Sequence, residues 1–361
     1  MPDRRSFLTS SVLSAAAFSP LSAVSALKDS GERLKVGQIG TKHAHAAGKM
    51  ATFRKYPEIF DVVGYVEPDA DRRAQIANDA TWKGLPVLTT EQLLETRGLQ
   101  IVAVETEINE LLPAAEKCVD AGIHIHLDKP AGTSLPRFRK ICQAADQAGV
   151  VIQLGYMFRS NPAFRYLFNA VESGWLGDIF QVHCEMSKKI GTGARAGLAK
   201  YRGGSMFELG CHLIDAVVRV LGKPESVSPF LKQTQPELDA LNDNCLAVFE
   251  YARATASIRS TLVEPFGGRR RQFVACGTNG TIVIRPLEPF HLTISLERPA
   301  GDLAKGTHEI KLPAVGGRYD GDLLHLAAVV LGQEKEEYSR THDLAVQEAV
   351  LKASAMPVDA A

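Results

Sequence analysis

Short apolar runs alternate with segments of helical periodicity over residues 34–154. The apolar runs, which have the length and composition of strands, lie at 34–40, 61–67, 100–105, 123–127 and 150–154. The helical patterns between them lie at 43–55, 69–79, 108–121 and 134–148. Repeated β-α units of this kind predict a doubly wound parallel sheet of the Rossmann type. Ligands of such a sheet bind outside the carboxyl ends of its strands, so the residues that follow each run are the first candidates for chemistry.

The pattern changes after about residue 155. A helix is expected near 161–173, a strand near 179–187 and a second helix within 203–222. Further strand-like runs follow one another at 244–251, 254–262, 271–276, 280–284 and 290–295. Strands in succession predict a largely antiparallel sheet and hence an α+β domain. Two amphipathic helices, near 320–331 and 342–356, close the chain and are expected to pack back on the first domain.

Length and composition agree with two domains. The chain has 361 residues, and 41 basic residues balance 41 acidic ones. We predict a Rossmann domain at 33–155 and a C-terminal α+β domain at 156–361. No basic stripe with interleaved aromatic residues is present in the sequence, which argues against nucleic acid as a partner. The six cysteines show no C-x-x-C spacing and are expected to be small core residues without an essential disulfide.

The first 26 residues have the features of a targeting segment. Arg4 and Arg5 precede Ser6-Phe-Leu8, a run rich in Ser and Ala follows, and Val24-Ser-Ala26 offers small residues for cleavage. This pattern predicts a twin-arginine signal at 1–26 and export to the periplasm. The apolar run is too short to span a bilayer comfortably, so no membrane span is expected after signal removal. A disordered basic tail is the alternative.

The loop after the first predicted strand has the position of a dinucleotide phosphate site. Gly40 can supply its tight turn, and Thr41, Lys42 and His43 follow before a helix whose N-terminus would receive a pyrophosphate. The usual G-x-G-x-x-G pattern would place glycines at 42 and 45, where this chain has Lys42 and His45.

The second predicted strand ends at an acidic residue. Glu67 stands about where a carboxylate would accept hydrogen bonds from the adenosine ribose hydroxyls, which favours NAD over NADP. An ordinary solvated residue at the start of the next helix is the alternative.

Three sequence motifs lie at the ends of predicted strands or in a predicted helix. Asp128-Lys-Pro130 follows the fifth strand, Tyr156-Met-Phe-Arg-Ser-Asn-Pro162 follows the sixth, and Gly203-Gly204 precedes Glu208-x-Gly-x-His212-x-x-Asp215. Pro130 ends its strand because it cannot donate a ladder hydrogen bond. In this order the motifs resemble the glucose-fructose oxidoreductase, inositol dehydrogenase and MocA (Gfo/Idh/MocA) family, from about Leu34 to the last helix.

The resemblance implies a division of labour within one site. It places Lys129 at the nicotinamide and the substrate, His212 as the acid/base group, and Glu208 one turn before that histidine. It further implies that Glu105 and Asp128 lie at the cofactor, and that Arg159, Asn161 and Asp215 lie on the substrate side. A homodimer or homotetramer is also implied by the resemblance.

Residue chemistry agrees with these implied roles. Residues 208 and 212 are one helical turn apart and would face the same way. Histidine suits proton transfer near neutral pH, and a desolvated lysine can have its pKa lowered enough to assist. The chain departs from the family at Thr106–Leu111, where a proline and a histidine that usually follow the fourth strand are missing. With Lys42, His43 and His45, these departures all lie around the cofactor.

Three functions are compatible with the sequence. The first is an NAD-linked oxidoreductase that acts on a sugar or cyclitol hydroxyl with a tightly bound, internally recycled cofactor, since free nicotinamide is scarce outside the cytoplasm. The second is a redox-neutral or metal-assisted lyase, hydrolase or isomerase of a keto-sugar or glycoside. The third is a non-catalytic sugar-binding protein, against which the retained Lys129 and His212 argue.

The metal-assisted alternative uses a group of histidines and carboxylates near the predicted strand ends. Histidines two apart at a helix start are expected to point in different directions, so the sequence assigns no metal ligand. The group comprises His43, His45, Glu105, Glu107, His126, Glu208 and His212.

Overall fold

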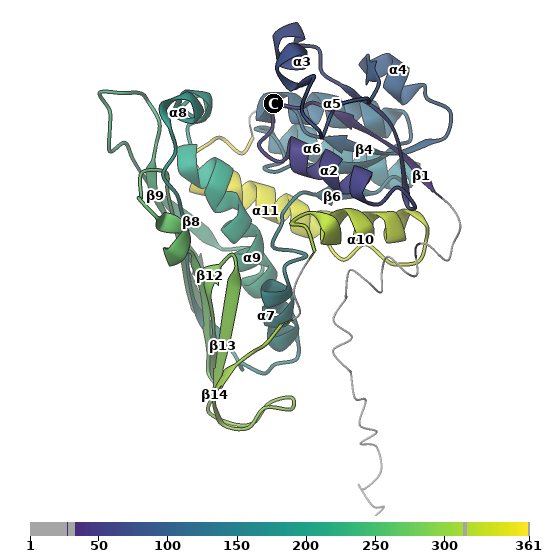
Figure 1. The fold of residues 1–361 in the computed structure, drawn as a ribbon. Coiled ribbons are helices and arrows are strands. Elements are labelled where there is room, and N and C mark those ends of the chain that lie inside the picture. The colour runs from purple at the N-terminus through teal and green to yellow at the C-terminus, as the bar shows by residue number, and fades with distance from the viewer. Residues whose placement is uncertain (1–26, 28–32, 313–315, 360–361) are drawn as a thin grey trace, which may run out of the picture.

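The computed structural model describes residues 27, 33–312 and 316–359. The predicted twin-arginine segment at 1–26 lies outside these residues. Figure 1 shows two lobes, an α/β unit built from the first part of the chain and a second unit with a long sheet, with α9, α10 and α11 running where the two meet.

The first lobe contains a six-stranded parallel sheet in the order β3-β2-β1-β4-β5-β6. This order, which reverses between β1 and β4, is that of the Rossmann fold, and the prediction of a doubly wound sheet is confirmed. Its strands are β1 (Leu34–Ile39), β2 (Phe60–Val66), β3 (Val87–Leu88), β4 (Leu99–Val104), β5 (His124–Leu127) and β6 (Ile152–Leu154).

Helices follow the strands of this sheet as the periodicity predicts. They are α2 (Ala46–Lys55), α3 (Ala70–Ile76), α4 (Thr90–Leu94), α5 (Ile108–Asp120) and α6 (Leu135–Ala148). Local chemistry sets their ends. The Ser134 side chain accepts a hydrogen bond from the Arg137 N–H at the start of α6, and Gly149 ends this helix with a φ of 65°.

The second lobe contains an eight-stranded sheet in the order β14-β13-β12-β11-β7-β10-β9-β8. All neighbouring pairs are antiparallel except β7 with β10, so the prediction of a largely antiparallel sheet is confirmed. The strands are β7 (Ile179–Ser187), β8 (Ser226–Lys232), β9 (Asn244–Tyr251), β10 (Ala254–Thr261), β11 (Gln272–Gly277), β12 (Gly280–Leu287), β13 (Phe290–Leu296) and β14 (Gly306–Glu309).

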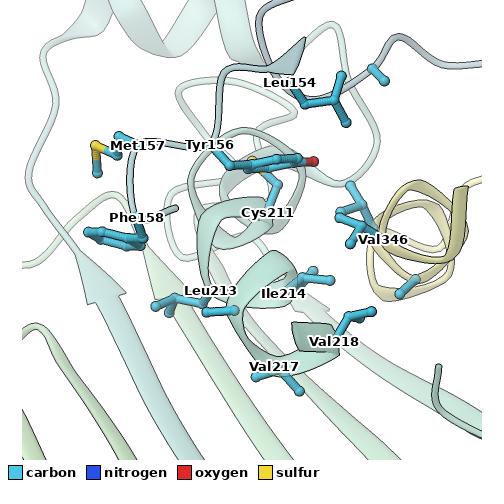
Figure 2. Packing of buried hydrophobic residues seen from close by; sticks show 14 of the residues in the cluster. Leu154, Tyr156, Met157, Phe158, Cys211, Leu213, Ile214, Val217, Val218 and Val346 are labelled. Atoms are coloured by element: carbon cyan, nitrogen blue, oxygen red, sulfur yellow. The ribbon is translucent and has the colours of Figure 1, made fainter. Parts of the chain in front are cut away.

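Helices α7 (Pro162–Glu172), α9 (Cys211–Leu221) and α11 (Arg340–Ala353) run beside this sheet (Figure 1). Helix α9 is mostly apolar, and all residues from Cys211 to Val218 are buried, including the polar His212 and Asp215. Figure 2 shows Leu213, Ile214, Val217 and Val218 projecting from successive turns of α9, with Val346 of α11 beside them. This packing holds the start of α9 in a fixed position, and His212 lies in that first turn.

The last part of the chain divides between the lobes. Helix α10 (Asp320–Val330) packs on the first sheet, where Leu323 and Leu324 share a core with Val36 of β1 and Phe53 of α2. Helix α11 contacts α9 and α6 instead. The sequence boundary at 156 assigns α10 to the second domain, whereas its buried side chains complete the core of the first. The chain therefore crosses between the lobes more than once.

The remaining elements are short. They are α8 (Thr192–Leu198), the π-helical turn η1 (Met206–Gly210) and the 3-10 turn η2 (Gly267–Arg270). Five of the six cysteines are buried and none of the six forms a disulfide, which confirms their role as small packing residues. Among the described residues, no helix has both the length and the apolar character needed to cross a membrane.

Candidate active site

Lys129 joins the two lobes at the carboxyl end of β5. Its Nζ donates a hydrogen bond of 2.8 Å to the backbone carbonyl oxygen of Glu208 and lies 3.4 Å from the Glu208 Oε1. Lys129 has no exposed surface, and Glu208 is almost completely buried. The strand end of the first domain and the π-helical turn of the second are thus held together by one ammonium group.

Glu208 lies inside the π-helical turn η1, a backbone irregularity that is frequent at functional sites. Its Oε2 faces Lys188 of the second domain at 3.8 Å. Burial raises the pKa of this carboxyl, but Lys129 and Lys188 outweigh burial and hold the pKa at about 2. Glu208 is therefore an anion at neutral pH and anchors the ammonium of Lys129.

The pKa of Lys129 departs from the expectation drawn from the sequence. Burial lowers the pKa of the amine, as expected, but the carboxylates of Glu208 and Asp128 raise it by more, and the net result is a raised pKa. The prediction that desolvation would lower the pKa is wrong because the sequence does not show that Glu208 packs against this amine. The Lys129 side chain is therefore charged at neutral pH.

His212 is buried in an aromatic pocket on the other side of Lys129. Its ring centroid lies 6.0 Å from that of Tyr156, 5.8 Å from that of Phe158 and 5.9 Å from that of His45. Burial lowers the pKa of the imidazole well below its usual value, and the charge of Lys129 adds to this effect. His212 is neutral at pH 7, and its Nδ1 has no hydrogen-bond partner within the described residues.

His43, His45 and Asp128 form a compact group at the ends of β1 and β5. The His43 Nδ1 lies 2.6 Å from the Asp128 Oδ2, and the His45 Nδ1 lies 3.1 Å from the Asp128 Oδ1. The expectation that the two histidines point in different directions is wrong. The loop before α2 turns both rings toward Asp128, with their centroids 4.9 Å apart.

Two buried carboxyl groups of opposite behaviour meet at this point. Burial and the charge of Asp128 raise the pKa of Glu105 well above its usual value. The pKa of Asp128 is affected by burial in the same sense, but the two imidazoles of His43 and His45 lower it well below its usual range. The pair resembles other carboxyl pairs whose environments separate their pKa values.

The adenosine side of the Rossmann sheet is open. A cavity of about 750 Å³ lies outside the ends of β1, β2 and β4, and Gly40, Lys42, Glu67 and Thr106 are among its lining residues. Gly40 has a φ of 92°, and a Cβ there would meet the backbone of Glu105 at 2.7 Å, so only glycine fits this turn. The size and place of the cavity suit half of a dinucleotide.

Glu67 lies on the wall of this cavity. Its Oε2 accepts a hydrogen bond of 2.6 Å from the Thr41 hydroxyl, and its Oε1 accepts one from the Asp69 N–H. Lys42, which replaces a glycine of the usual pattern, turns outward and pairs with Asp69 at 2.8 Å. The lysine therefore leaves the phosphate loop open.

The structure places Arg159 and Asp215 in a buried network beyond His212. The Arg159 guanidinium donates three hydrogen bonds to the two carboxylate oxygens of Asp215 and one, of 2.7 Å, to Asp343 of α11, and His342 lies 3.3 Å from Asp215. Both oxygens of Asp215 are thus engaged inside the protein. Asn161 caps α7, with its side-chain oxygen accepting from the backbone N–H groups of residues 163 and 164. These contacts are internal to the protein and stabilise the segments around the site.

Three side chains to which the sequence assigned no role complete the pocket. Lys188 at the end of β7 approaches Glu208, and the Tyr319 ring packs 5.5 Å from that of His45. The Tyr156 hydroxyl is buried with no hydrogen-bond partner in the described part of the chain. Tyr156 begins the motif after the sixth strand and carried a signal. No local pattern marks Lys188 or Tyr319, which reach the site only through the fold.

Comparison with known proteins identifies the family. Residues 34–156 match the oxidoreductase family with an NAD-binding Rossmann fold, and residues 164–283 match the GFO/IDH/MocA C-terminal domain. The chain belongs to the Gfo/Idh/MocA family of oxidoreductases. Both matches lie within the two lobes and follow the order in which the site motifs occur.

Curated relatives within the Gfo/Idh/MocA family include dehydrogenases of both cofactor types. The chain is 25% identical over 213 residues to scyllo-inositol 2-dehydrogenase (NAD(+)) of Bacillus subtilis, covering 56% of this chain and 60% of that protein. It is 21% identical over 193 residues to scyllo-inositol 2-dehydrogenase (NADP(+)) IolW of the same organism, covering 50% of this chain and 51% of that protein. The chain thus matches about half to three fifths of the length of these relatives.

Solved structures show the same fold over nearly the whole chain. UDP-N-acetylglucosamine 3-dehydrogenase GnnA from Acidithiobacillus ferrooxidans is similar with a TM-score of 0.71 at 17% identity, covering 91% of this chain and 98% of that one. An oxidoreductase from Thermotoga maritima is similar with a TM-score of 0.72, also at 17% identity and with the same coverage. Both lobes of the Gfo/Idh/MocA architecture are therefore present.

Proposed function

We propose that this protein is an NAD-linked oxidoreductase that acts on a hydroxyl group of a sugar or cyclitol. The observation that carries the proposal is the contact of the buried, charged Lys129 at the end of β5 with Glu208, which lies just before the buried His212 in the second domain. Burial and the charge of Lys129 both lower the pKa of His212. Relatives named as inositol and UDP-N-acetylglucosamine dehydrogenases support this substrate class.

The residues around the cleft suit a dinucleotide at its adenosine end. Gly40 and Lys42 of the phosphate loop line the cavity, and Glu67 would accept hydrogen bonds from the ribose hydroxyls, which favours NAD over NADP. Asp128 and Glu105 would border the nicotinamide end, where His43 and His45 narrow the space. When bound, the nicotinamide ring would supply the hydride acceptor.

The side chains of this chain would handle the proton. The neutral imidazole of His212 can accept the proton of the substrate hydroxyl, because its lowered pKa leaves it unprotonated at pH 7. The Lys129 ammonium stabilises the negative charge that develops on the substrate oxygen. Glu208 holds this ammonium in place through its carbonyl and carboxylate oxygens. We propose that the substrate side of the pocket is supported indirectly by Arg159, Asn161 and Asp215, whose side chains contact other protein groups.

Two further features belong to the proposal. The predicted twin-arginine segment supports a periplasmic location. In that compartment the cofactor would have to remain bound, and a second sugar would have to return it to its oxidised form. Family resemblance supports a homodimer or homotetramer. Both features can be tested on the purified, exported protein.

A redox-neutral reaction through a keto intermediate is the second candidate. It is favoured by Glu105, a buried carboxyl whose pKa is raised well above its usual value by burial and by the neighbouring Asp128. An elimination, hydrolysis or epimerisation next to a ketone needs one group that accepts a proton and another that donates one. His212 would be the acceptor and Glu105 the donor in such a reaction.

The decisive experiment starts from protein purified without added nucleotide. The protein is denatured, and the released small molecules are identified by mass spectrometry, while the intact protein is assayed with a panel of inositols and hexoses. Bound NAD and substrate-dependent absorbance at the nicotinamide band support the first candidate. Bound NAD with product formation but no net reduction supports the second. Protein that contains no nucleotide and binds no NAD contradicts both.

A further inference from the structure

His43, His45, Asp128 and Glu105 bring two imidazoles and two carboxyl groups together at the ends of β1, β4 and β5. One nitrogen or oxygen atom from each of His43, His45 and Asp128 lies within 4.8 Å of the others. The Glu105 Oε2 lies 3.8 Å from the His43 Nδ1. Asp128 and Glu105 have no exposed surface. The four side chains come from three separate segments, so the fold assembles the group.

Protein donors satisfy only part of this group. The Asp128 Oδ1 accepts hydrogen bonds from the Lys129 N–H at 2.6 Å and from the His45 ring at 3.1 Å. Among the described residues, no donor with hydrogen-bond geometry reaches the Asp128 Oδ2 or either Glu105 oxygen, and the nearest groups are the His43 ring, 2.6 Å from the Asp128 Oδ2, and the Asp128 carboxyl beside Glu105. Buried carboxylate oxygens are normally satisfied, and each exception requires a physical explanation.

The His43 Nδ1 sharpens this conflict. It accepts a hydrogen bond of 3.3 Å from the His45 backbone N–H, which requires a lone pair on that nitrogen. The same atom lies 2.6 Å from the Asp128 Oδ2, another lone-pair carrier. A proton on Nδ1 would satisfy the carboxylate and remove the acceptor for His45. A cation between the two atoms would bind the lone pairs of both and would take the place of the long 3.3 Å contact from the His45 N–H.

We propose that His43, His45, Asp128 and Glu105 bind a divalent first-row transition metal ion. The His43 Nδ1, the His45 Nδ1 and the Asp128 Oδ2 are the three ligand atoms, and Glu105 is either the fourth ligand or the partner of a bound water. Two imidazoles and a carboxylate favour Zn²⁺, Fe²⁺ or Co²⁺ over Mg²⁺ or Ca²⁺, which prefer oxygen ligands.

The present distances are close to what such a site requires. With bonds of about 2.0–2.1 Å, neighbouring ligand atoms of a tetrahedral site lie roughly 3.3 Å apart. The His43 Nδ1 and the Asp128 Oδ2 are closer than this, at 2.6 Å, and no two of the three ligand atoms are more than 4.8 Å apart. The Lys129 N–H already fixes the Asp128 Oδ1, as an outer partner of a metal-binding carboxylate does. Modest side-chain adjustments complete the site.

The inference goes beyond the proposed function and does not depend on it. The metal would lie next to Lys129 and within reach of His212, where an open coordination position can polarise a hydroxyl or carbonyl oxygen of a substrate. It would also occupy the narrowed end of the cleft, at the position where the Gfo/Idh/MocA family usually has glycines. Metal binding and NAD binding can therefore be measured separately.

The test uses the full chain without a polyhistidine tag. The protein is freed of metal with a chelator and titrated with Co²⁺ and Zn²⁺ by calorimetry, and visible Co²⁺ absorption bands report the coordination geometry. We expect wild type to bind a single ion per chain. His43→Ala and Asp128→Asn should each weaken the affinity by at least about 100-fold, the loss that follows removal of a ligand or its support. Zn²⁺ should also raise the melting temperature of wild type.

A matched control removes a histidine of another histidine–carboxylate pair. His291 lies 3.2 Å from Glu309 on the surface, and His291→Ala should leave the metal affinity unchanged. Where Asp128→Asn lowers the stability too far for purification, Glu105→Gln replaces it. Wild type that binds no ion, or variants that bind as tightly as wild type, would overturn the inference.

NAD binding of the metal-free protein is followed in parallel by fluorescence. Metal binding without NAD binding contradicts the proposed function and keeps this inference. NAD binding without metal binding gives the reverse result, so the two failures are distinguishable.

Discussion

The Nζ of Lys129 and the backbone oxygen of Glu208 are 2.8 Å apart, although the residues are 79 positions apart in the chain. This contact ties the Rossmann sheet to the π-helical turn of the second domain. Because the Glu208 carboxylate also lies within 3.4 Å, the ammonium is both fixed in position and fully ionised.

Lys129→Ala is expected to lower turnover by at least about 100-fold, since it removes the charge that stabilises the developing oxyanion. It should also lower stability, because Glu208 keeps its negative charge in a buried site. Turnover is measured with the substrate identified from the panel. The control is Lys200→Ala, which removes a surface lysine paired with Glu107. A Lys129→Ala variant that turns over at the wild-type rate would rule out the assigned role.

His212→Asn should lower kcat by about 10²–10⁴-fold, the usual contribution of a general acid/base group. The substitution keeps a polar side chain of similar size among Tyr156 and Phe158, so KM should change much less. The acidic limb of the pH profile of kcat should disappear in the variant. A variant that lowers kcat and retains the wild-type pH profile would assign His212 a packing role only.

Glu67→Ser should narrow the preference for NAD over NADP. The carboxylate repels a 2′-phosphate and accepts hydrogen bonds from free ribose hydroxyls, so its loss should weaken NAD and improve NADP binding, changing the ratio of the two by at least about 10-fold. Both dissociation constants are measured by fluorescence titration. Glu91→Ser, at another wall of the same cavity, is the control. An unchanged ratio would show that Glu67 serves the Thr41 hydroxyl alone.

The pH dependence of stability should carry the signature of buried neutral histidines. Burial lowers the pKa of His126 to about 3, against about 6.5 in an unfolded chain. The unfolded chain therefore binds a proton that the folded chain does not, and stability is lost as the pH falls below 6.5. From pH 7 to pH 5 this single group should reduce the free energy of unfolding by about 2 kcal/mol.

Urea unfolding at pH 7 and pH 5 measures this loss. In His126→Gln, the decrease between the two pH values should be smaller than in wild type by a similar amount, because glutamine does not titrate. The Gln153 side chain, which faces His126 at 3.0 Å, remains able to pair with the new amide. Equal decreases in the two proteins would contradict a buried neutral His126.

Arg159→Met is expected to lower the free energy of unfolding by about 3–5 kcal/mol, because it leaves the carboxylates of Asp215 and Asp343 buried without their cation. Thermal melting measures the effect. Lys305→Ala breaks the exposed pair with Glu297 and should cost less than about 1 kcal/mol. Activity per folded molecule should fall little in Arg159→Met. A large loss of kcat in fully folded protein would show that Arg159 contacts the substrate.

The periodicity of the chain determined the order and type of most elements. Strand β5 and the Asp128-Lys-Pro130 motif could be placed because an apolar run followed by proline is typical of a strand that ends there, since proline cannot donate a hydrogen bond to the neighbouring strand. Helix α9 and His212 were placed by the apolar face of residues 211–221. These features are local, and local patterns survive without knowledge of the fold.

Strands with weak local signals were missed. Strand β8 contains Pro229 and alternates only between partial burial and exposure, as an edge strand does, and β14 and β3 are too short and polar to stand out. Each is defined by hydrogen bonds to the strand next to it in chain order, across an intervening connection, and not by a pattern within its own residues.

Only the tertiary structure determined which side chains of the site are charged and which are neutral. The sequence offers Lys129, His43 and Arg159 as candidate groups, yet their roles depend on Glu208, Asp128 and Asp343, which come from other segments. A pKa follows the burial and the charges around a group, and both are set by contacts that form only when distant parts of the chain pack together. For this reason the sequence determined which side chains could do chemistry, and the fold decided which are charged, which are neutral and which only support the others.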